Sequence, residues 1–447
     1  MWLRDLLLLG GTAGICVGSL FNPVFGILAY FGYSFFSPQS YMYAFSSTLP
    51  HVQAIAIATL VGYIFWREPK YFPKEREFFV LLFLWAWFGF TTIFSIDPES
   101  AIGSLFQISK ILLMVVLALS LINSNDRLFW LIRVFALSIG IYGIKSGLYI
   151  LVNGPHSMIT GPIASFFYAN TALGLALTMN VPLLVFLSKV DPYTWGRWIA
   201  KVSLVLTYPA VVGTFSRGAW VGLALVTFLI LLKSRHKAKV VAFGVILVIA
   251  SPVWLPYVLT DEISGRFDTL VNYEEDSSAE SRFWNWEFCA RVGISNPLTG
   301  GGFQFYSPEL YAQYFPEFTE RWGAGKVWSC HNMWLTIWSE HGILAFLVWL
   351  RLFGFALLSL LKLRATEERN VGLTWVVEFS DMATVSLLGF MLMGVFLDVA
   401  YYEGFYVLLG LIIIVKNLKR HGPTHPIFDH GSSGQRRGML ESNVRVS

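Results

Sequence analysis

Arg217 lies in the run TFSRG at residues 214–218, between two apolar segments and with no carboxylate close by in the sequence. The planar guanidinium of arginine makes paired hydrogen bonds to phosphate oxygens, and Ser216 adds a hydroxyl beside it. An arginine that only anchored a helix at the membrane interface would need no such neighbour. The run therefore favours an anion-binding role for Arg217 and Ser216.

A second group of charged residues lies in the stretch ESRFWNWEFCAR at 280–291, which has the pattern of an amphipathic helix. Its tryptophans and phenylalanines favour the membrane–water interface, so we expect this helix to lie along the membrane surface. Arg282 and Arg291 are nine residues apart, roughly 180° around a helix, so they need not point the same way. Glu280, Arg282 and Arg291 are candidates for substrate contacts.

His331 stands at the start of the apolar segment 332–360, and Glu340 and His341 follow inside that segment. Histidine gains or loses a proton near neutral pH, which suits a general base. The ten-residue spacing puts His331 and His341 on different faces of a helix, and no third ligand is evident, so we expect no metal. Two histidines that merely cap a helix are the alternative. We favour a catalytic role for His331 because it closes the loop that carries the arginines.

Lys145 lies inside the apolar segment 128–152, a few residues before its end. A lysine there can extend its amine to the interface and do nothing more, or it can present a cation to an anionic substrate. The two interpretations have equal weight from the sequence. The glycines of GGGF at 300–303 allow close backbone approach to a ligand, but they lack the strand–turn–helix setting of a nucleotide loop.

These residues together suit an anionic lipid, above all one that carries a pyrophosphate, held at a membrane surface. Arginines would neutralise a phosphate leaving group, and a histidine or carboxylate would deprotonate an acceptor hydroxyl. The residues alone indicate a reaction class and no particular sugar.

The elements that position these residues are membrane-spanning helices. The chain is 55% hydrophobic and 13% charged, with a mean hydropathy of +0.59. Apolar runs of about 17–25 residues recur, each long enough to cross a bilayer core, where only helices satisfy their own backbone. We expect an all-α polytopic membrane protein of about twelve spans. The segments are 6–36 (broken near Asn22 and Pro23), 52–66, 78–95, 103–122, 128–152, 163–188, 198–214, 219–232, 239–258, 332–360, 380–400 and 403–416.

The first segment is too long for one straight helix and short for two, so thirteen spans are the alternative. We favour twelve, with Arg4 and the C-terminal tail both in the cytoplasm. No cleavage site for a signal peptide follows the first segment.

Lysines and arginines gather in alternate loops, around 67–76, 189–201, 233–239 and 362–369, which predicts that these loops are cytoplasmic. The acidic 260–331 loop is then periplasmic. The expected organisation is a helix bundle at 1–259, this large loop with amphipathic helices, C-terminal spans at 332–416, and a disordered cytoplasmic tail at 417–447. The net charge of +4 reflects membrane orientation and does not indicate nucleic acid.

Three cysteines, Cys16, Cys289 and Cys330, lack metal-ligand spacing. Cys289 and Cys330 share the long loop, so a disulfide is geometrically feasible in an oxidising compartment. We favour two unpaired, buried thiols.

With these motifs the chain resembles the O-antigen ligase superfamily, and within it the exosortase-A-associated O-glycosylation ligases. The resemblance runs from about Arg4 to the last span. It rests on the order and spacing of motifs that are individually weak: GIKSG at 143–147, Gly161-Pro162 with Asn170, GTFSRG at 213–218, EDSS at 275–278 leading to Ser281-Arg282 and Trp286, NPL at 296–298, GGGF at 300–303, His331, and EHG at 340–342.

The resemblance implies a metal-independent glycosyltransferase, without a cofactor, in the bacterial inner membrane. It implies transfer of a glycan from undecaprenyl diphosphate to an acceptor at the periplasmic face. Arg217 and Arg282 would bind the diphosphate, and His331 would be the base or would position the acceptor. Lys145, Asn170, Ser216, Glu280, Arg291, Glu340 and His341 are the predicted substrate contacts.

The sequence departs from the branch pattern at Phe215, at 168–170 and at Asn332, which leaves the acceptor open. A lipid A core sugar, a protein Ser or Thr, and another lipid-linked repeat are all compatible, the last making the protein a polysaccharide polymerase. A lipid or polysaccharide transporter is the alternative from another class, but no repeated half or paired broken helices are visible. A non-catalytic scaffold for export is a further alternative.

Overall fold

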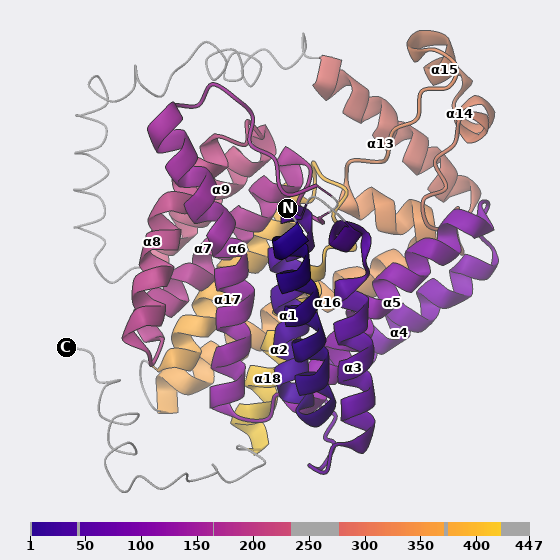
Figure 1. Ribbon diagram of the computed structural model, residues 1–447. Helices are drawn as coiled ribbons and strands as arrows, with labels where there is room; N and C mark the ends of the chain where they lie inside the picture. Colours follow the sequence, from indigo (N-terminus) through magenta and orange to yellow (C-terminus); the bar gives the residue numbers. More distant parts are fainter. Residues whose placement is uncertain (1, 43–44, 164, 234–276, 371–373, 422–447) are drawn as a thin grey trace, which may run out of the picture.

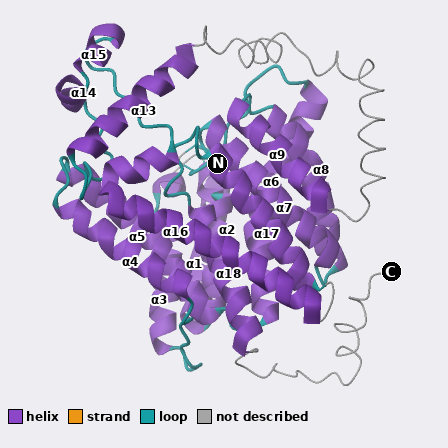
Figure 2. Ribbon diagram, turned by 180° about the vertical axis from the view of Figure 1, so that it is seen from behind, coloured by secondary structure: helices purple, strands orange, loops and turns teal. Residues whose placement is uncertain are grey.

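The computed structural model describes residues 2–42, 45–163, 165–233, 277–370 and 374–421, and these are helices joined by turns and loops (Figures 1 and 2). The bundle helices are α1 (Trp2–Phe21), α2 (Pro23–Phe36), α3 (His51–Phe65), α4 (Arg76–Ile93), α5 (Pro98–Leu121), α6 (Asn125–Asn153), α7 (Asn170–Val190), α8 (Thr194–Val212), α9 (Arg217–Lys233), α16 (Met333–Asn370), α17 (Trp375–Met393) and α18 (Glu403–His421). Shorter elements are η1 (Pro38–Tyr41), η2 (Phe45–Thr48), α13 (Ser277–Ser295), α14 (Pro308–Tyr314) and α15 (Pro316–Trp322). The expected all-α architecture is thus seen throughout the described ranges.

Seven of the described helices are long and apolar enough to cross a membrane: α1, α4, α5, α6, α7, α16 and α17. Helices α2 and α3 are apolar but shorter. The expected count of twelve or thirteen spans is therefore not confirmed. The segment expected at 239–258 and the tail from 422 lie outside the described residues.

The segment 6–36 forms two helices. The Asn22 side chain accepts hydrogen bonds from the amides of Val24 and Phe25 and so caps α2, which starts at Pro23. A Cβ on Gly18 would touch Phe25, and one on Gly11 would reach Tyr33, so α1 and α2 are antiparallel.

This hairpin changes the expected position of the N-terminus. The Asp5 carboxylate binds the amide of Ser46 at one end of the bundle. At the other end Lys416, near the end of α18, pairs with Glu75 and Glu77 at the start of α4. Arg4 and the start of the tail therefore lie at opposite ends, and the single-span interpretation of 6–36, which put them on one side, was wrong.

Helix α6 packs closely on α8 because glycines line the contact. A Cβ on Gly140, Gly143 or Gly147 would lie 2.1–2.9 Å from atoms of Ser203, Thr207 or Leu206. Small residues at this spacing let two helix backbones approach, which is how helices associate where water supplies no driving force. Helix α7, largely buried, fills the space beside them.

Helices α13–α15 form a lobe that projects from one end of the bundle (Figure 1). The lobe has its own apolar core, built from Phe288, Cys289, Val292, Phe305, Leu310, Tyr311, Phe315, Phe318 and Cys330. The helix expected at 280–291 is confirmed as part of α13. The same end carries the start of α9, the start of α16 and the 394–402 turn, so the polar residues of interest gather there.

Candidate functional site

Helix α16 is interrupted close to its start, at Gly342, whose φ of 78° and ψ of 177° are not helical. A Cβ at Gly342 would lie 2.1 Å from the Leu298 carbonyl oxygen, so only glycine fits there. The glycine-rich loop packs against the break: the amides of Gly301 and Gly302 donate to the carbonyls of Ser339 and Glu340 at 2.7 and 2.9 Å. The GGGF run therefore satisfies the backbone groups that the interruption frees.

Glu340 and His341, beside the interruption, are fully buried in one network. Glu340 accepts hydrogen bonds from Tyr401 Oη at 2.5 Å, the Gln304 amide at 3.1 Å and Tyr306 Oη at 3.4 Å. His341 Nε2 lies 2.8 Å from the same Tyr401 hydroxyl, and its Nδ1 lies 2.7 Å from Thr91 Oγ1. Both predicted substrate contacts are thus tied into the packing around the broken helix, and a direct role in binding stays a prediction.

His331 precedes α16 with a left-handed φ of 48°. The side chain of Asn332 accepts hydrogen bonds from the amides of Trp334 and Leu335, at 3.0 and 3.3 Å, and so caps the helix. Burial lowers the pKa of His331, the carboxylate of Asp398 opposes that shift, and the nearby guanidinium of Arg282 lowers the pKa further. His331, Arg282 and Asp398 therefore share one electrostatic neighbourhood, although they come from three separate elements.

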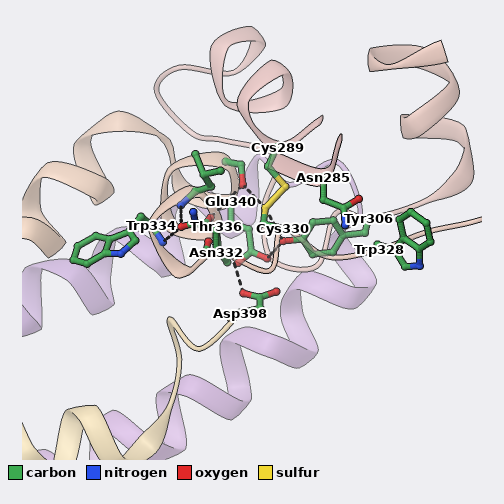
Figure 3. Close-up of a disulfide and its surroundings, with 12 residues drawn as sticks. Asn285, Cys289, Tyr306, Trp328, Cys330, Asn332, Trp334, Thr336, Glu340 and Asp398 are labelled. Carbon is green, nitrogen blue, oxygen red and sulfur yellow. Dashed lines mark hydrogen bonds between the residues drawn. A yellow bond between two sulfur atoms is a disulfide. The ribbon is translucent and has the colours of Figure 1, made fainter. Parts of the chain in front are cut away.

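Asp398 is a residue that the sequence did not single out. It lies in the turn between α17 and α18, where it accepts a hydrogen bond from Thr336 Oγ1 at 2.8 Å (Figure 3) and another from the Ser329 side chain. Burial raises its pKa, and these hydrogen bonds and His331 oppose the rise. An acidic residue in a turn otherwise made of apolar residues was the signal that could have identified it.

Arg217 begins α9 after a tight turn. Phe215 adopts a φ of 53°, a conformation that non-glycine residues rarely take. The Ser216 hydroxyl accepts from the Ala219 amide at 3.3 Å, and Asn170 Nδ2 donates to the Thr214 carbonyl at 2.8 Å. Ser216 and Asn170 therefore shape the turn that presents Arg217, whatever further contact they make with a ligand.

The Arg217 turn lies beside the segment that leads to Asp398. A Cβ on Gly218 would lie 3.7 Å from Phe396, and the Gly394 carbonyl accepts from the Met333 amide at 2.8 Å. Contacts thus run from the start of α9 through 394–398 to the start of α16. The structure brings Arg217 to the same end of the bundle as His331 and Arg282.

Lys145 lines a groove of about 680 Å³ at this end, between the last turns of α6, η1 and the 157–163 loop. Its ammonium lies 4.7 Å from the centre of the Tyr41 ring. Ser40, Asn153 and Thr160 add polar groups, while Leu148, Val152 and Ile163 are exposed and apolar. The groove borders the Arg217 turn, because the Ile159 amide donates to the Gly213 carbonyl at 2.8 Å.

Arg291 and Glu280 lie apart from this neighbourhood, in ion pairs within the lobe. Arg291 binds Glu287 at 2.6 Å and Glu317 at 3.2 Å, and Glu280 binds Arg321 at 2.5 Å. These pairs are largely exposed, and those with Glu317 and Arg321 join α13 to α15. Substrate contacts by Arg291 and Glu280 stay predictions, and our proposals do not depend on them.

Cys289 and Cys330 form a disulfide with their Cα atoms 6.0 Å apart (Figure 3). The favoured interpretation of two unpaired thiols was wrong, because the two cysteines, 41 residues apart in sequence, meet in the core of the lobe. Cys16 is the free cysteine. Among the residues described, no group of three or more His, Cys, Asp or Glu side chains is arranged to hold a metal ion.

The fold and these residues define a polytopic membrane protein with a polar site at one end of its helix bundle. Residues 202–350 match the family described as O-Antigen ligase, and this range contains Arg217, Arg282 and His331. Residues 202–350 are therefore similar to O-antigen ligases, which indicates a function in glycan transfer at a membrane. Residues 3–191 match a family of unknown function (DUF5935). No curated protein matches the chain significantly.

Proposed function

We propose that the protein is a glycosyltransferase that moves a glycan from undecaprenyl diphosphate to an acceptor hydroxyl at the periplasmic face of the bacterial inner membrane. The observation that carries the proposal is the meeting of His331, Arg282 and Asp398 at the start of α16, in a chain that is similar to O-antigen ligases over residues 202–350. We expect O-glycosylation because the motifs resemble those of the exosortase-A-associated O-glycosylation ligases.

In the reaction, the oxygen of the acceptor hydroxyl bonds to the anomeric carbon of the glycan as the bond from that carbon to the diphosphate oxygen breaks. His331 Nδ1 or Nε2 takes the hydroxyl proton. A histidine with a lowered pKa is neutral at pH 7 and can act as this base, which typically contributes roughly 10²–10⁴-fold in rate. Asp398 then stabilises the imidazolium that forms.

The leaving diphosphate gains negative charge as the bond breaks. Arg217 and Arg282 suit its oxygens because two guanidinium groups offer several fixed N–H donors. A divalent metal is not needed for this step if both arginines contact the diphosphate.

The groove at Lys145 is our proposed entrance for an anionic, membrane-anchored part of a substrate. An ammonium at its wall attracts phosphate, and its exposed apolar side chains match the lipid that surrounds this end of the bundle. Ser216 and Asn170 would act at its border through the turn that they shape.

The experiment is a transfer assay with purified protein in liposomes and a lipid-linked glycan. Arg217→Ala, Arg282→Ala and His331→Ala should each abolish transfer while the protein still inserts into the membrane. Full transfer by all three variants would overturn the proposal. Lys201→Ala is the control for loss of a positive charge, because Lys201 is an exposed cation in the first half of α8, away from the end of that helix that leads to the Arg217 turn.

The acceptor is identified by competition in the same assay. A lipid A core, a serine- and threonine-containing peptide and a second lipid-linked glycan are supplied together, and the labelled product is separated. Labelled lipid A core or peptide identifies a ligase of the corresponding kind. Elongated lipid-linked glycan identifies a polymerase.

A further inference from the structure

The disulfide between Cys289 and Cys330 joins two parts of the proposed site, and the inference drawn from it rests on the proposed function. Cys330 directly precedes His331 in the sequence, and Cys289 belongs to α13, which carries Arg282. Both cysteines are fully buried. The covalent bond therefore lies between the two chain segments that bring a base and an arginine together.

The helical register puts Arg282 and Cys289 on one face of α13. Seven residues make about two helical turns, so the two side chains leave the helix within roughly 20° of each other and about 10 Å apart along its axis. The face that is fixed by the disulfide is thus the face that bears Arg282. Arg291 lies on a different face and pairs with Glu287 and Glu317 instead.

Two further contacts with α16 come from the last turn of α13 and the residues that follow it. A Cβ on Gly293 would lie 3.1 Å from the Trp338 ring, and the Ile343 amide donates to the Pro297 carbonyl at 2.9 Å. Closer to Arg282, the side-chain oxygen of Asn285 lies 3.2 Å from the Tyr311 hydroxyl. The same hydroxyl lies 2.7 Å from the Trp328 carbonyl oxygen. The disulfide and this hydrogen-bonded link both end on the segment 328–330, directly before His331.

We propose that the Cys289–Cys330 disulfide is a positioning element for glycan transfer, which holds Arg282 at the distance from His331 that the reaction requires. Transfer then depends on the oxidised form of the protein. Forming the bond removes two electrons and two protons from the thiols, and an exchangeable disulfide of an oxidising compartment accepts them and becomes a dithiol. The same requirement places this lobe on the side of the membrane where such oxidants act.

The test compares the double variant Cys289→Ser/Cys330→Ser with wild type and with Cys16→Ser in the liposome assay. We expect kcat/KM for the lipid-linked donor to fall about 10- to 100-fold in the double variant, the size of loss that a small misplacement of a reacting group produces. Cys16→Ser should behave as wild type. The acid limb of the pH profile should move to higher pH in the double variant, because both the burial of His331 and the proximity of Arg282 lower its pKa.

A double-mutant cycle separates positioning of Arg282 from general loss of structure. The conservative variant Arg282→Lys is combined with the double cysteine variant. If the disulfide acts through Arg282, the combined loss is smaller than the product of the separate losses. Multiplicative losses with an unmoved pH profile, or full activity without the disulfide, would overturn the proposal.

If the double cysteine variant does not accumulate, wild-type protein is reduced in a mild denaturant and then reoxidised. Thiol labelling counts the open bonds, and transfer is measured at each stage. Activity should fall with labelling and return on reoxidation; activity that is independent of labelling would contradict the inference. Absence of transfer by the untreated wild-type protein would instead count against the proposed function.

Discussion

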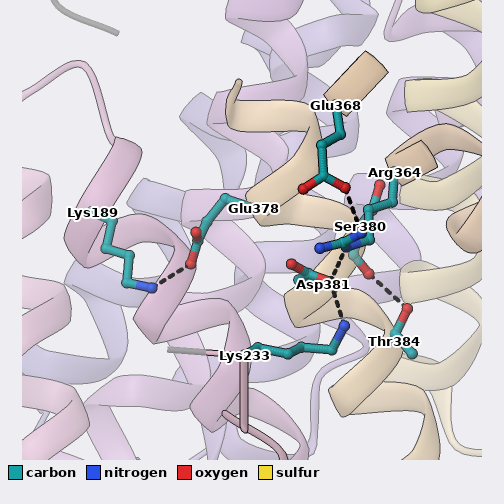
Figure 4. A network of polar contacts seen from close by, with 8 residues as sticks. All are labelled: Lys189, Lys233, Arg364, Glu368, Glu378, Ser380, Asp381 and Thr384. Carbon is teal, nitrogen blue, oxygen red and sulfur yellow. Dashed lines mark hydrogen bonds and ion pairs between the residues drawn. The ribbon is translucent and has the colours of Figure 1, made fainter. Parts of the chain in front are cut away.

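Lys233 and Arg364 both bind the Asp381 carboxylate at one end of the bundle, and Arg364 also binds Glu368 at 2.6 Å (Figure 4). At the other end, Asp398 is bound by the hydroxyl of Thr336, and Glu340 by the hydroxyls of Tyr401 and Tyr306. The two ends thus use the same acidic residue types with different partners. We call them the ion-paired end and the site end.

The difference lies in how charge is compensated. At the ion-paired end Asp381 is neutralised by Lys233 and Arg364, and the buried Asp191 is neutralised by Arg133, so these contacts hold helices together. At the site end Asp398 and Glu340 are oriented by hydroxyl groups in place of lysine or arginine side chains. Groups oriented in this way can respond to a proton or a cation that arrives during a reaction, which is typical of functional sites.

Asp398→Asn tests the effect of the Asp398 carboxylate on His331 at the site end. We expect roughly a 10- to 100-fold loss of kcat, because the amide keeps the shape but cannot stabilise an imidazolium. The Asp398 carboxylate raises the pKa of His331, so its removal lowers that pKa. Since the base must be neutral, the acid limb of the pH–rate profile should move to lower pH, opposite to the shift expected from loss of the disulfide. An unchanged profile would show that Asp398 does not act on His331.

Gly342→Ala tests whether the interrupted helix supports the site. The positive φ and the contact of a Cβ with the Leu298 carbonyl should cost about 1–3 kcal/mol in stability and reduce transfer, since Glu340 and the start of α16 would shift. Gly354→Ala is the matched control, because a Cβ at Gly354 on the same helix meets nothing within 4 Å. Thermal unfolding in detergent and the transfer assay measure both effects. Equal melting temperatures for the two variants would show that the positive φ of Gly342 and its contact with Leu298 do not exclude a Cβ at this position.

Lys233→Met tests the ion-paired end and should have the smallest effect. Asp381 keeps its second partner, Arg364, so stability should fall by about 0.5–1 kcal/mol, as for other partly exposed ion pairs. The rate of transfer per folded molecule should stay within about twofold of wild type, because a change of roughly 0.4 kcal/mol or less in the barrier has that effect. A large loss of rate without loss of stability would remove the distinction between the two ends.

The helices could be predicted from the sequence because an apolar run within a membrane must satisfy its own backbone hydrogen bonds, which a helix does. The expected segments 52–66, 78–95 and 103–122 correspond to α3, α4 and α5. The hairpin in 6–36 was harder, because Asn22 as a cap and Pro23 as a first helical residue indicate a new helix but not its direction. The direction depends on contacts between α1, α2 and α3.

The candidate site could be predicted only in part. Arg217, Arg282 and His331 belong to local motifs, whereas Asp398 and Tyr401 reach the site from a turn far away in the sequence. The i,i+4 spacing indicates the pairing of Arg291 with Glu287, but only the packing of the lobe shows that Arg291 also pairs with Glu317. The disulfide was missed because spacing alone does not determine which cysteines meet.

The most direct measurement compares one arginine from each end, Arg217→Ala and Arg364→Ala, for the rate of glycan transfer per correctly inserted molecule in liposomes. We expect transfer to be lost in Arg217→Ala and to be close to the wild-type rate in Arg364→Ala, whose only expected defect is reduced stability. Comparable rates in the two variants would contradict the claim that the site end performs the transfer.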